Sequence, residues 1–145
     1  MTRINSAIPV KNLTDEHLLA EHREIKRLPS CLAKAVNSGS IHKIPQKFTL
    51  GKGHVLFFLD KMSFIRQRYL EIYNECMTRG MNVQTYLSNF DNIDCRFMNE
   101  YIPTTEEHEL LIDRIKSRIS ESKREFYHYR SKRISKDKAI RILEA

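Results

Sequence analysis

The stretch that decides the fold is residues 54–79, HVLFFLDKMSFIRQRYLEIYNECMTR. Apolar side chains recur in it at the three- and four-residue spacing of an α-helix with one buried face. Gly80 follows directly and supplies a helix stop. We therefore predict one long scaffold helix from His54 to Arg79, with Phe57, Phe58 and Phe64 in the core rather than in a base-stacking platform.

A charged helix precedes this scaffold and is expected to pack on it. Thr14 is a good N-cap for a helix from Asp15 to Lys26, because acidic residues in the first turn complement the helix dipole. A short helix over 31–37 follows, with Gly39 just past its end.

A third main helix is predicted near the C-terminus. Thr104 and Glu107 have the spacing of a capping box, and the helix after them turns Leu111, Ile115 and neighbouring apolar residues inward. Arg114 and Arg118 stack four residues apart on another side of it. The tail from Ser135 to Ala145 reads as one more short helix.

The fold class that follows is all-α. We expect a single compact domain of about three main helices, with long connecting loops and a short extra C-terminal helix. The main helical domain is predicted over residues 1–134, and a basic C-terminal extension over 135–145.

The 145 residues carry a formal net charge of +7, and most of the excess lies near the C-terminus. Residues 113–145 contain 11 Lys and Arg against 5 Asp and Glu. A concentrated basic region favours a polyanion such as nucleic acid as the partner, although a merely soluble basic surface remains an alternative.

Other classes of protein are disfavoured by what the sequence contains. No apolar run approaches the roughly 18 residues of a membrane-spanning helix, and the first residues are polar, so we expect a cytoplasmic protein with no membrane contact. Cys31, Cys76 and Cys95 are widely spaced, and no histidine pair has ligand spacing. Reduced thiols, no metal and no cofactor are therefore expected.

Residues 126–133, FYHYRSKR, interleave aromatic rings with cations. Such a pattern suits a nucleic-acid strand, because rings stack on bases while cations meet phosphates. An aromatic cluster that covers the core is an equally good interpretation of the same residues.

The start of the chain offers a nucleophile. Thr2 is small, so removal of Met1 is expected to leave a free α-amine. An α-amine has an ordinary pKa of about 7.7–8.0, and its neutral form can attack an electrophilic carbon to form a Schiff base. Glu24, set among Arg23 and Arg27, could move protons beside it, although a charge run of this kind also suits a solvated helix face.

Five segments together resemble a known family. They are TRIN at 2–5, HLLAEHREIKR at 17–27, LGKGHVLFFLDK at 50–61, ECMTRGMN at 75–82 and YIP at 101–103. In this order they are similar to the phage pyrimidine-dimer DNA glycosylases with AP lyase activity, the endonuclease V family, up to about Lys132.

The resemblance implies a function. It implies removal of the 5′ base of a cyclobutane pyrimidine dimer through an imine with the Thr2 amine, and strand nicking by β-elimination, with Glu24 as catalytic glutamate. The implied substrate is double-stranded DNA with UV photoproducts or abasic sites, bound by a monomer in a bacterial or phage-infected cytoplasm. The implied DNA-binding residues are Arg3, His17, Arg23, Arg27, Arg114 and Arg118.

The chain also departs from the family. The segment between Asn5 and Leu13 is one residue longer, Tyr69 replaces an expected glutamine, and Phe126 replaces an expected tryptophan. Loop 82–100 aligns poorly. The alternative function is therefore a DNA-binding homologue that has lost dimer recognition and retains at most abasic-site lyase activity. An unrelated basic helical interaction protein is a third interpretation.

Overall fold

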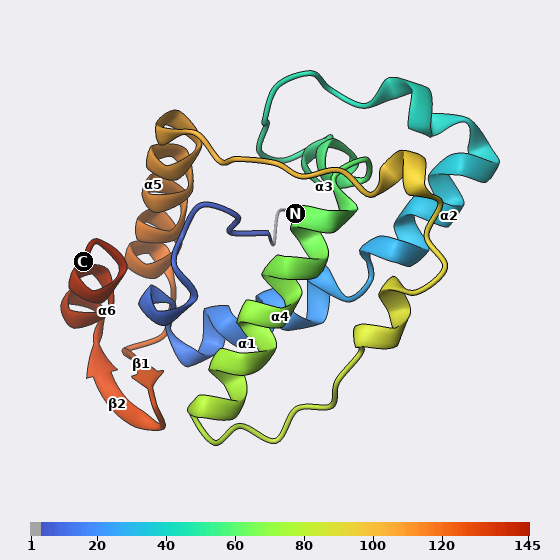
Figure 1. Cartoon of the computed structure of the whole chain (residues 1–145). Coiled ribbons are helices and arrows are strands. Elements are labelled where there is room, and N and C mark those ends of the chain that lie inside the picture. Colours follow the sequence, from blue (N-terminus) through green and yellow to red (C-terminus); the bar gives the residue numbers. More distant parts are fainter. Residues whose placement is uncertain (1–3) are drawn as a thin grey trace.

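The computed structural model describes residues 4–145, and helices dominate it (Figure 1). The elements are α1 (Asp15–Ile25), α2 (Leu28–Ser38), α3 (His54–Phe58), α4 (Met62–Thr78), α5 (Thr105–Glu121), β1 (Phe126–Tyr129), β2 (Lys132–Ser135) and α6 (Lys136–Leu143). Short 3₁₀ turns occur at Val10–Asn12, Ser40–Lys43, Leu87–Phe90 and Cys95–Phe97. The predicted helical fold class is confirmed, with a small hairpin added to it.

The centre of the molecule is α4 (Figure 1). Ile65, Tyr69 and Ile72 on α4 are fully buried. Helix α1 packs on α4, and its Leu18 and Ile25 are also fully buried. Figure 1 shows α2 on one side of this pair and α5 on the other. The prediction that the region after His54 forms the scaffold is therefore confirmed.

The scaffold is interrupted, so the prediction of a single helix from 54 to 79 is wrong between α3 and α4. At the break, Lys61 donates from Nζ to the carbonyl oxygen of Phe57 at 2.8 Å. The Asn99 amide donates to the carbonyl of Asp60, also at 2.8 Å. These side-chain hydrogen bonds satisfy backbone carbonyl groups at the break. The helix is therefore interrupted without a proline or glycine.

Only half of the predicted capping box forms at the start of α5. Thr104 Oγ1 accepts from the backbone N–H of Glu107 at 3.1 Å. The Glu107 carboxylate does not complete the box; it is buried and accepts hydrogen bonds from the hydroxyls of Ser6 and Tyr101. Burial and this carboxylate raise the pKa of Tyr101. Glu107 thus ties the N-terminal segment to α5.

The aromatic segment near the C-terminus forms a β-hairpin, which the sequence did not indicate. Strands β1 and β2 pair antiparallel, with Tyr129 opposite Lys132. The two turn residues, Arg130 and Ser131, have φ angles of 50° and 69°. Their backbone N–H groups donate to the Asp15 carboxylate at 3.0 and 2.9 Å, so α1 holds the turn in place.

The last helix packs onto the rest of the chain. Ala139 and Leu143 of α6 are buried in the same hydrophobic core as α4, and α6 contacts α5 and both strands. The Asn12 amide donates to the carbonyl of Ala145 at 3.1 Å, which ties the segment before α1 to the residue that follows α6.

Two departures from the family are accommodated inside the fold. The Tyr69 ring is fully buried 5.5 Å from the ring of His22, and its hydroxyl accepts from the N–H of Tyr86 at 2.7 Å. The longer N-terminal segment winds into the 3₁₀ turn Val10–Asn12. Neither residue 69 nor this turn lines the pocket described below.

Candidate functional site

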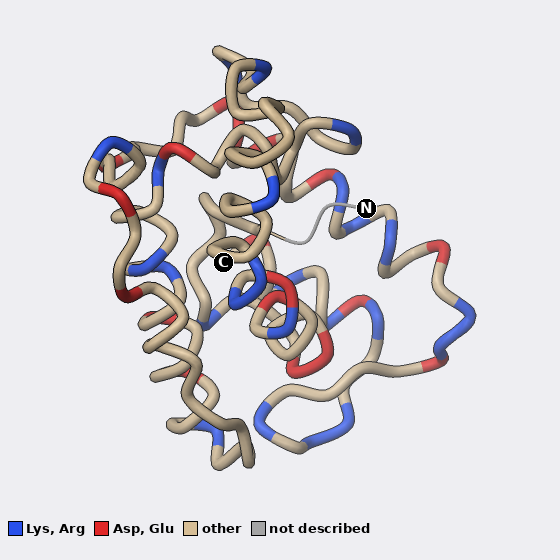
Figure 2. The backbone as a smooth tube through the Cα atoms, turned by 90° about the vertical axis from the view of Figure 1, so that its right-hand side faces the viewer, with Lys and Arg blue, Asp and Glu red and all other residues tan. Residues whose placement is uncertain are grey.

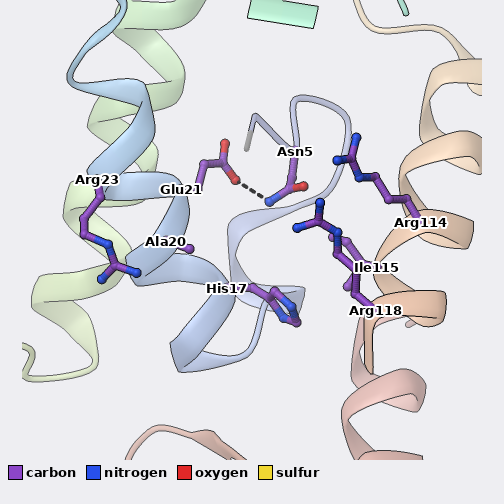
Figure 3. A pocket seen from close by; sticks show the side chains of 8 residues that line it. All are labelled: Asn5, His17, Ala20, Glu21, Arg23, Arg114, Ile115 and Arg118. Atoms are coloured by element: carbon purple, nitrogen blue, oxygen red, sulfur yellow. Dashed lines mark hydrogen bonds between the residues drawn. The ribbon is translucent and has the colours of Figure 1, made fainter. Parts of the chain in front are cut away.

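A pocket of about 250 Å³ lies between α1 and α5 (Figure 3). The part of the chain that the structure describes contributes Asn5, His17, Ala20, Glu21, Arg23, Arg114, Ile115 and Arg118 to its lining. Figure 3 shows Asn5 in the gap between the two helices, with α1 residues on one side and α5 residues on the other. The site therefore depends on three segments that are far apart in the sequence.

Cationic side chains surround this pocket. Arg114 and Arg118 project from α5 toward Asn5, and Arg23 lies on the α1 side (Figure 3). Guanidinium groups recognise phosphate oxygens through paired hydrogen bonds, and their combined field attracts anions. With His17, the structure brings four of the predicted DNA-binding residues to one place.

The carboxylate in the pocket lining, that of Glu21, already accepts hydrogen bonds from neighbouring side chains. Glu21 is fully buried, and Arg68 donates to it from Nε at 2.8 Å and from Nη2 at 3.0 Å. Asn5 donates a third hydrogen bond to Glu21 at 3.0 Å, drawn in Figure 3. Arg68 also donates to the carbonyl of Ile8 at 2.6 Å. This network fixes the N-terminal segment against α1 and α4.

Sequence reasoning missed these supporting residues, although a signal was present. Arg68 falls between Ile65 and Ile72 on the buried face of α4. An arginine at a core-facing helical position requires a buried acid as its partner. Glu21, on the apolar side of α1, meets that requirement.

Glu24 lies about one helical turn after Glu21 on α1. It follows Ala20 by four residues and Glu21 by three, which puts it along the same side of α1. Its Oε2 is 3.4 Å from Nη1 of Arg27, and 34% of the Glu24 side chain is exposed. The described pocket lining does not include Glu24 or Arg27; they lie on the exposed continuation of this helix face.

His17 has both a structural and a pocket-facing position. Its Nδ1 is 2.9 Å from Oγ1 of Thr14, the N-cap of α1. Its ring stacks on Tyr127 with centroids 5.6 Å apart, and it lines the pocket. The hairpin thus orients one wall of the site.

Two predicted residues, Thr2 and Arg3, lie outside the described part of the chain. The description begins at Ile4, which is fully buried, and continues to Asn5 in the pocket.

The C-terminal aromatic residues serve packing in this structure. Tyr127 is buried, Arg133 covers the ring of Phe126 at 3.9 Å, and Arg79 covers the ring of Tyr129 at 4.4 Å. Of the two interpretations of residues 126–133, this arrangement favours the aromatic cluster that covers the core.

Basic and acidic residues lie next to one another in several parts of the chain (Figure 2). Cys31, Cys76 and Cys95 are free thiols. Within residues 4–145, no cluster of three or more His, Cys, Asp or Glu side chains could hold a metal ion. No helix in the same range is long and apolar enough to cross a membrane.

Comparison with known protein families agrees with the resemblance seen in the motifs. A family model described as pyrimidine dimer DNA glycosylase matches residues 1–89. The matched region contains α1 through α4 and hence the His17 to Arg27 face, whereas Arg114 and Arg118 lie beyond it. Because the match covers more than half of the sequence, the chain belongs to the pyrimidine dimer DNA glycosylase family.

Proposed function

We propose that the protein is a DNA repair glycosylase with AP lyase activity, which removes the 5′ base of a cyclobutane pyrimidine dimer and nicks the strand. The family implies the glycosylase activity and a damaged-DNA substrate. The observation that carries the proposal is the cationic pocket between α1 and α5 in which Asn5 lies. Thr2 precedes Asn5 by three residues, which span at most about 11 Å of chain.

In this proposal the Thr2 α-amine is the nucleophile, made available by removal of Met1. The amine nitrogen bonds to C1′ of the 5′ nucleotide as the glycosidic bond breaks, and the base leaves with the bonding electrons and takes up a proton. The nitrogen then loses a proton, its lone pair opens the C1′–O4′ bond, and O4′ takes up a proton to become a hydroxyl, which leaves a protonated imine that joins enzyme and sugar.

Strand cleavage follows from the chemistry of the protonated imine, which draws electrons from C2′ and makes its proton removable. Loss of that proton forms a C2′–C3′ double bond and expels the 3′ phosphate oxygen, so that the strand is cut. Addition of water to the imine then returns the free amine.

Glu24 is the carboxylate we assign to these proton transfers. Glu21 already accepts three hydrogen bonds from Arg68 and Asn5. Glu24 lies one turn away on the same side of α1, is partly exposed, and its contact with Arg27 is long at 3.4 Å. It is therefore free to approach the reacting sugar and to stabilise the cationic intermediate.

The arginines are assigned to the DNA backbone. Arg23, Arg114 and Arg118 line the pocket, Arg27 lies next to it on α1, and Arg3 follows the nucleophile in sequence. A reacting carbon inside a duplex becomes accessible only if the DNA kinks and a nucleotide leaves the stack, which costs less where damage has weakened pairing.

Nicking of supercoiled plasmid tests the proposed function. UV-irradiated plasmid should be converted to the open circular form, while unirradiated plasmid, and irradiated plasmid whose dimers have been reversed by photolyase, should stay supercoiled. Nicking of plasmid with abasic sites but not of irradiated plasmid would support the homologue that has lost dimer recognition. No nicking of either substrate would contradict both functions.

A further inference from the structure

Residues 5–8 form a tight turn in the N-terminal segment, called the 5–8 turn below. The backbone N–H of Ile8 donates to the carbonyl oxygen of Asn5 at 2.9 Å, which closes the turn. The side chain of Asn5 lines the cationic pocket, whereas Ile8 is fully buried in the core. The turn therefore joins the pocket to the interior of the molecule.

One buried ion pair holds both ends of the 5–8 turn. The Asn5 amide donates to Glu21 of α1 at 3.0 Å. Arg68 of α4 donates from Nη1 to the carbonyl oxygen of Ile8 at 2.6 Å, and from Nε and Nη2 to Glu21. All three nitrogens of the guanidinium group are thus engaged, and 4% of the Arg68 side chain is exposed.

The middle of the turn is bonded to a third helix. The Ser6 hydroxyl donates to the carboxylate of Glu107, in the first turn of α5, and both residues are buried. Figure 1 shows the N-terminal segment passing between α5 and the pair formed by α1 and α4. Since α1 and α5 supply the two sides of the pocket, the 5–8 turn is fixed to both sides.

Stability alone is a weak reason for these buried charges. Taking charged groups out of water is costly, and replacing a buried ion pair with apolar residues of similar volume often leaves a protein equally stable or more so. An apolar pair in place of Glu21 and Arg68 could not form directed hydrogen bonds with the Asn5 amide and the Ile8 carbonyl. The pair therefore determines the orientation of the turn.

We propose that Arg68 is a positioning residue for the reaction, which acts through Glu21 to hold the 5–8 turn at the mouth of the pocket. This inference rests on the proposed function, because the turn directly follows the segment that carries the nucleophile assigned there. All the hydrogen bonds it invokes are formed between residues 5 and 107. A misplacement of reacting groups by about 1 Å can cost roughly 100-fold in rate, and a loosened turn permits such a misplacement.

Two substitutions remove the support at different points. Arg68→Lys keeps the positive charge but lacks the planar fork that reaches Glu21 and the Ile8 carbonyl together. Asn5→Ala removes the amide of a half-buried side chain, so it disturbs the core less. The double variant tests whether both act through the same turn. Arg141→Lys, an exposed change on α6, is the matched control.

The measurement is the single-turnover rate of borohydride trapping on an abasic duplex at saturating protein. It is made at a temperature at which circular dichroism shows each variant to be fully folded, so that lost stability alone cannot lower the rate. The Kd for the same duplex comes from fluorescence anisotropy. Hydrogen exchange of the Ile8 amide, followed by NMR, reports on the turn itself.

Arg68→Lys should trap roughly 100-fold more slowly, with an unchanged Kd and faster exchange at Ile8. Asn5→Ala should show the same pattern, and the double variant should be no slower than the slower single variant, because both remove one support. Arg141→Lys should match the wild type in all three quantities.

Three outcomes would overturn the role of Arg68. They are wild-type rates in both single variants, a loss confined to Kd, and rate losses that multiply in the double variant. If Arg68→Lys does not fold, the rate and the Ile8 exchange of Asn5→Ala decide. Failure of the proposed function looks different, because the wild-type adduct would then map to a lysine instead of Thr2.

Discussion

Glu21 and Glu24 are three residues apart on α1 and have opposite environments. Glu21 is fully buried and accepts from Arg68 and Asn5, while Glu24 is partly exposed and 3.4 Å from Arg27. A buried carboxylate that accepts several hydrogen bonds holds structure, and a loosely held one can exchange protons with a substrate. We therefore assign a structural role to Glu21 and the proton transfers to Glu24.

Glu24→Gln is expected to lower the rate of cleavage of dimer-containing DNA by roughly 10²–10⁴-fold, because an amide cannot accept the proton. The Kd for the same DNA, measured by fluorescence anisotropy, should stay within about threefold. Glu109→Gln, an exposed position on α5, is the control. Parallel loss of binding and cleavage in Glu24→Gln would mean that Glu24 is structural.

His54 makes a second prediction at this scale, on the pH dependence of stability. Burial lowers its pKa from 6.5 to about 4, so the unfolded chain binds this proton more readily than the folded one. Stability should therefore fall as the pH drops from 6.5 to 4, by about 3 kcal/mol from this group.

Urea unfolding at several pH values between 7 and 4 measures this effect. The free energy of unfolding of His54→Asn should decrease less over that range than that of the wild type. An identical decrease in both proteins would show that His54 is not held neutral by the fold.

At the scale of elements, the hairpin of β1 and β2 depends on α1. Its two-residue turn has both central residues at positive φ, as a type I′ turn requires, yet they are Arg130 and Ser131. Such turns normally use Asn or Gly. The Asp15 carboxylate accepts from both turn N–H groups and from Arg79, and these bonds stabilise the strained turn.

Asp15→Asn should lower the free energy of unfolding by about 1–3 kcal/mol, because the amide keeps one acceptor oxygen and its NH2 group cannot accept from the donors on the other side. Hydrogen exchange should accelerate in residues 126–135 more than in α4. The exposed Asp113→Asn on α5 is the control and should change neither quantity. Unchanged hydrogen exchange in the hairpin of Asp15→Asn would show that Asp15 does not stabilise the turn.

The same hairpin shows where prediction from the sequence stops. Helices α1 and α5 were predictable, because caps and apolar spacing are local signals. The turn at Arg130 was not, because its stability comes from Asp15, more than a hundred residues away. The break before α4 likewise contains no proline or glycine, and one of the side chains bonded to its carbonyls, Asn99, comes from a distant part of the chain.

At the scale of the whole molecule, the pocket joins α1 to α5 across the N-terminal segment (Figure 3). The types of residue in the site were predictable from motifs, and Arg23, Arg114 and Arg118 do converge. Their relative placement was not predictable, because it depends on the buried network of Glu21 and Arg68 that holds the segment between the helices.

This arrangement predicts the salt dependence of DNA binding. If Arg114 and Arg118 each neutralise a phosphate, Arg114→Gln or Arg118→Gln should reduce the slope of log affinity against log salt by about 0.9 in magnitude. Lys34→Gln, an exposed change on α2, should leave the slope unchanged. The measurement is anisotropy titration between 50 and 250 mM KCl; equal slopes for wild type and both arginine variants would exclude these contacts.

The most direct test of the account is borohydride reduction of the protein with an abasic duplex, followed by intact-mass and peptide analysis of the adduct. We predict a single covalent complex in which Met1 is absent and the sugar is attached to the α-amine of Thr2. An adduct on a lysine side chain, or the absence of any adduct under conditions in which the strand is cut, would contradict the claim that the N-terminal amine carries the reaction.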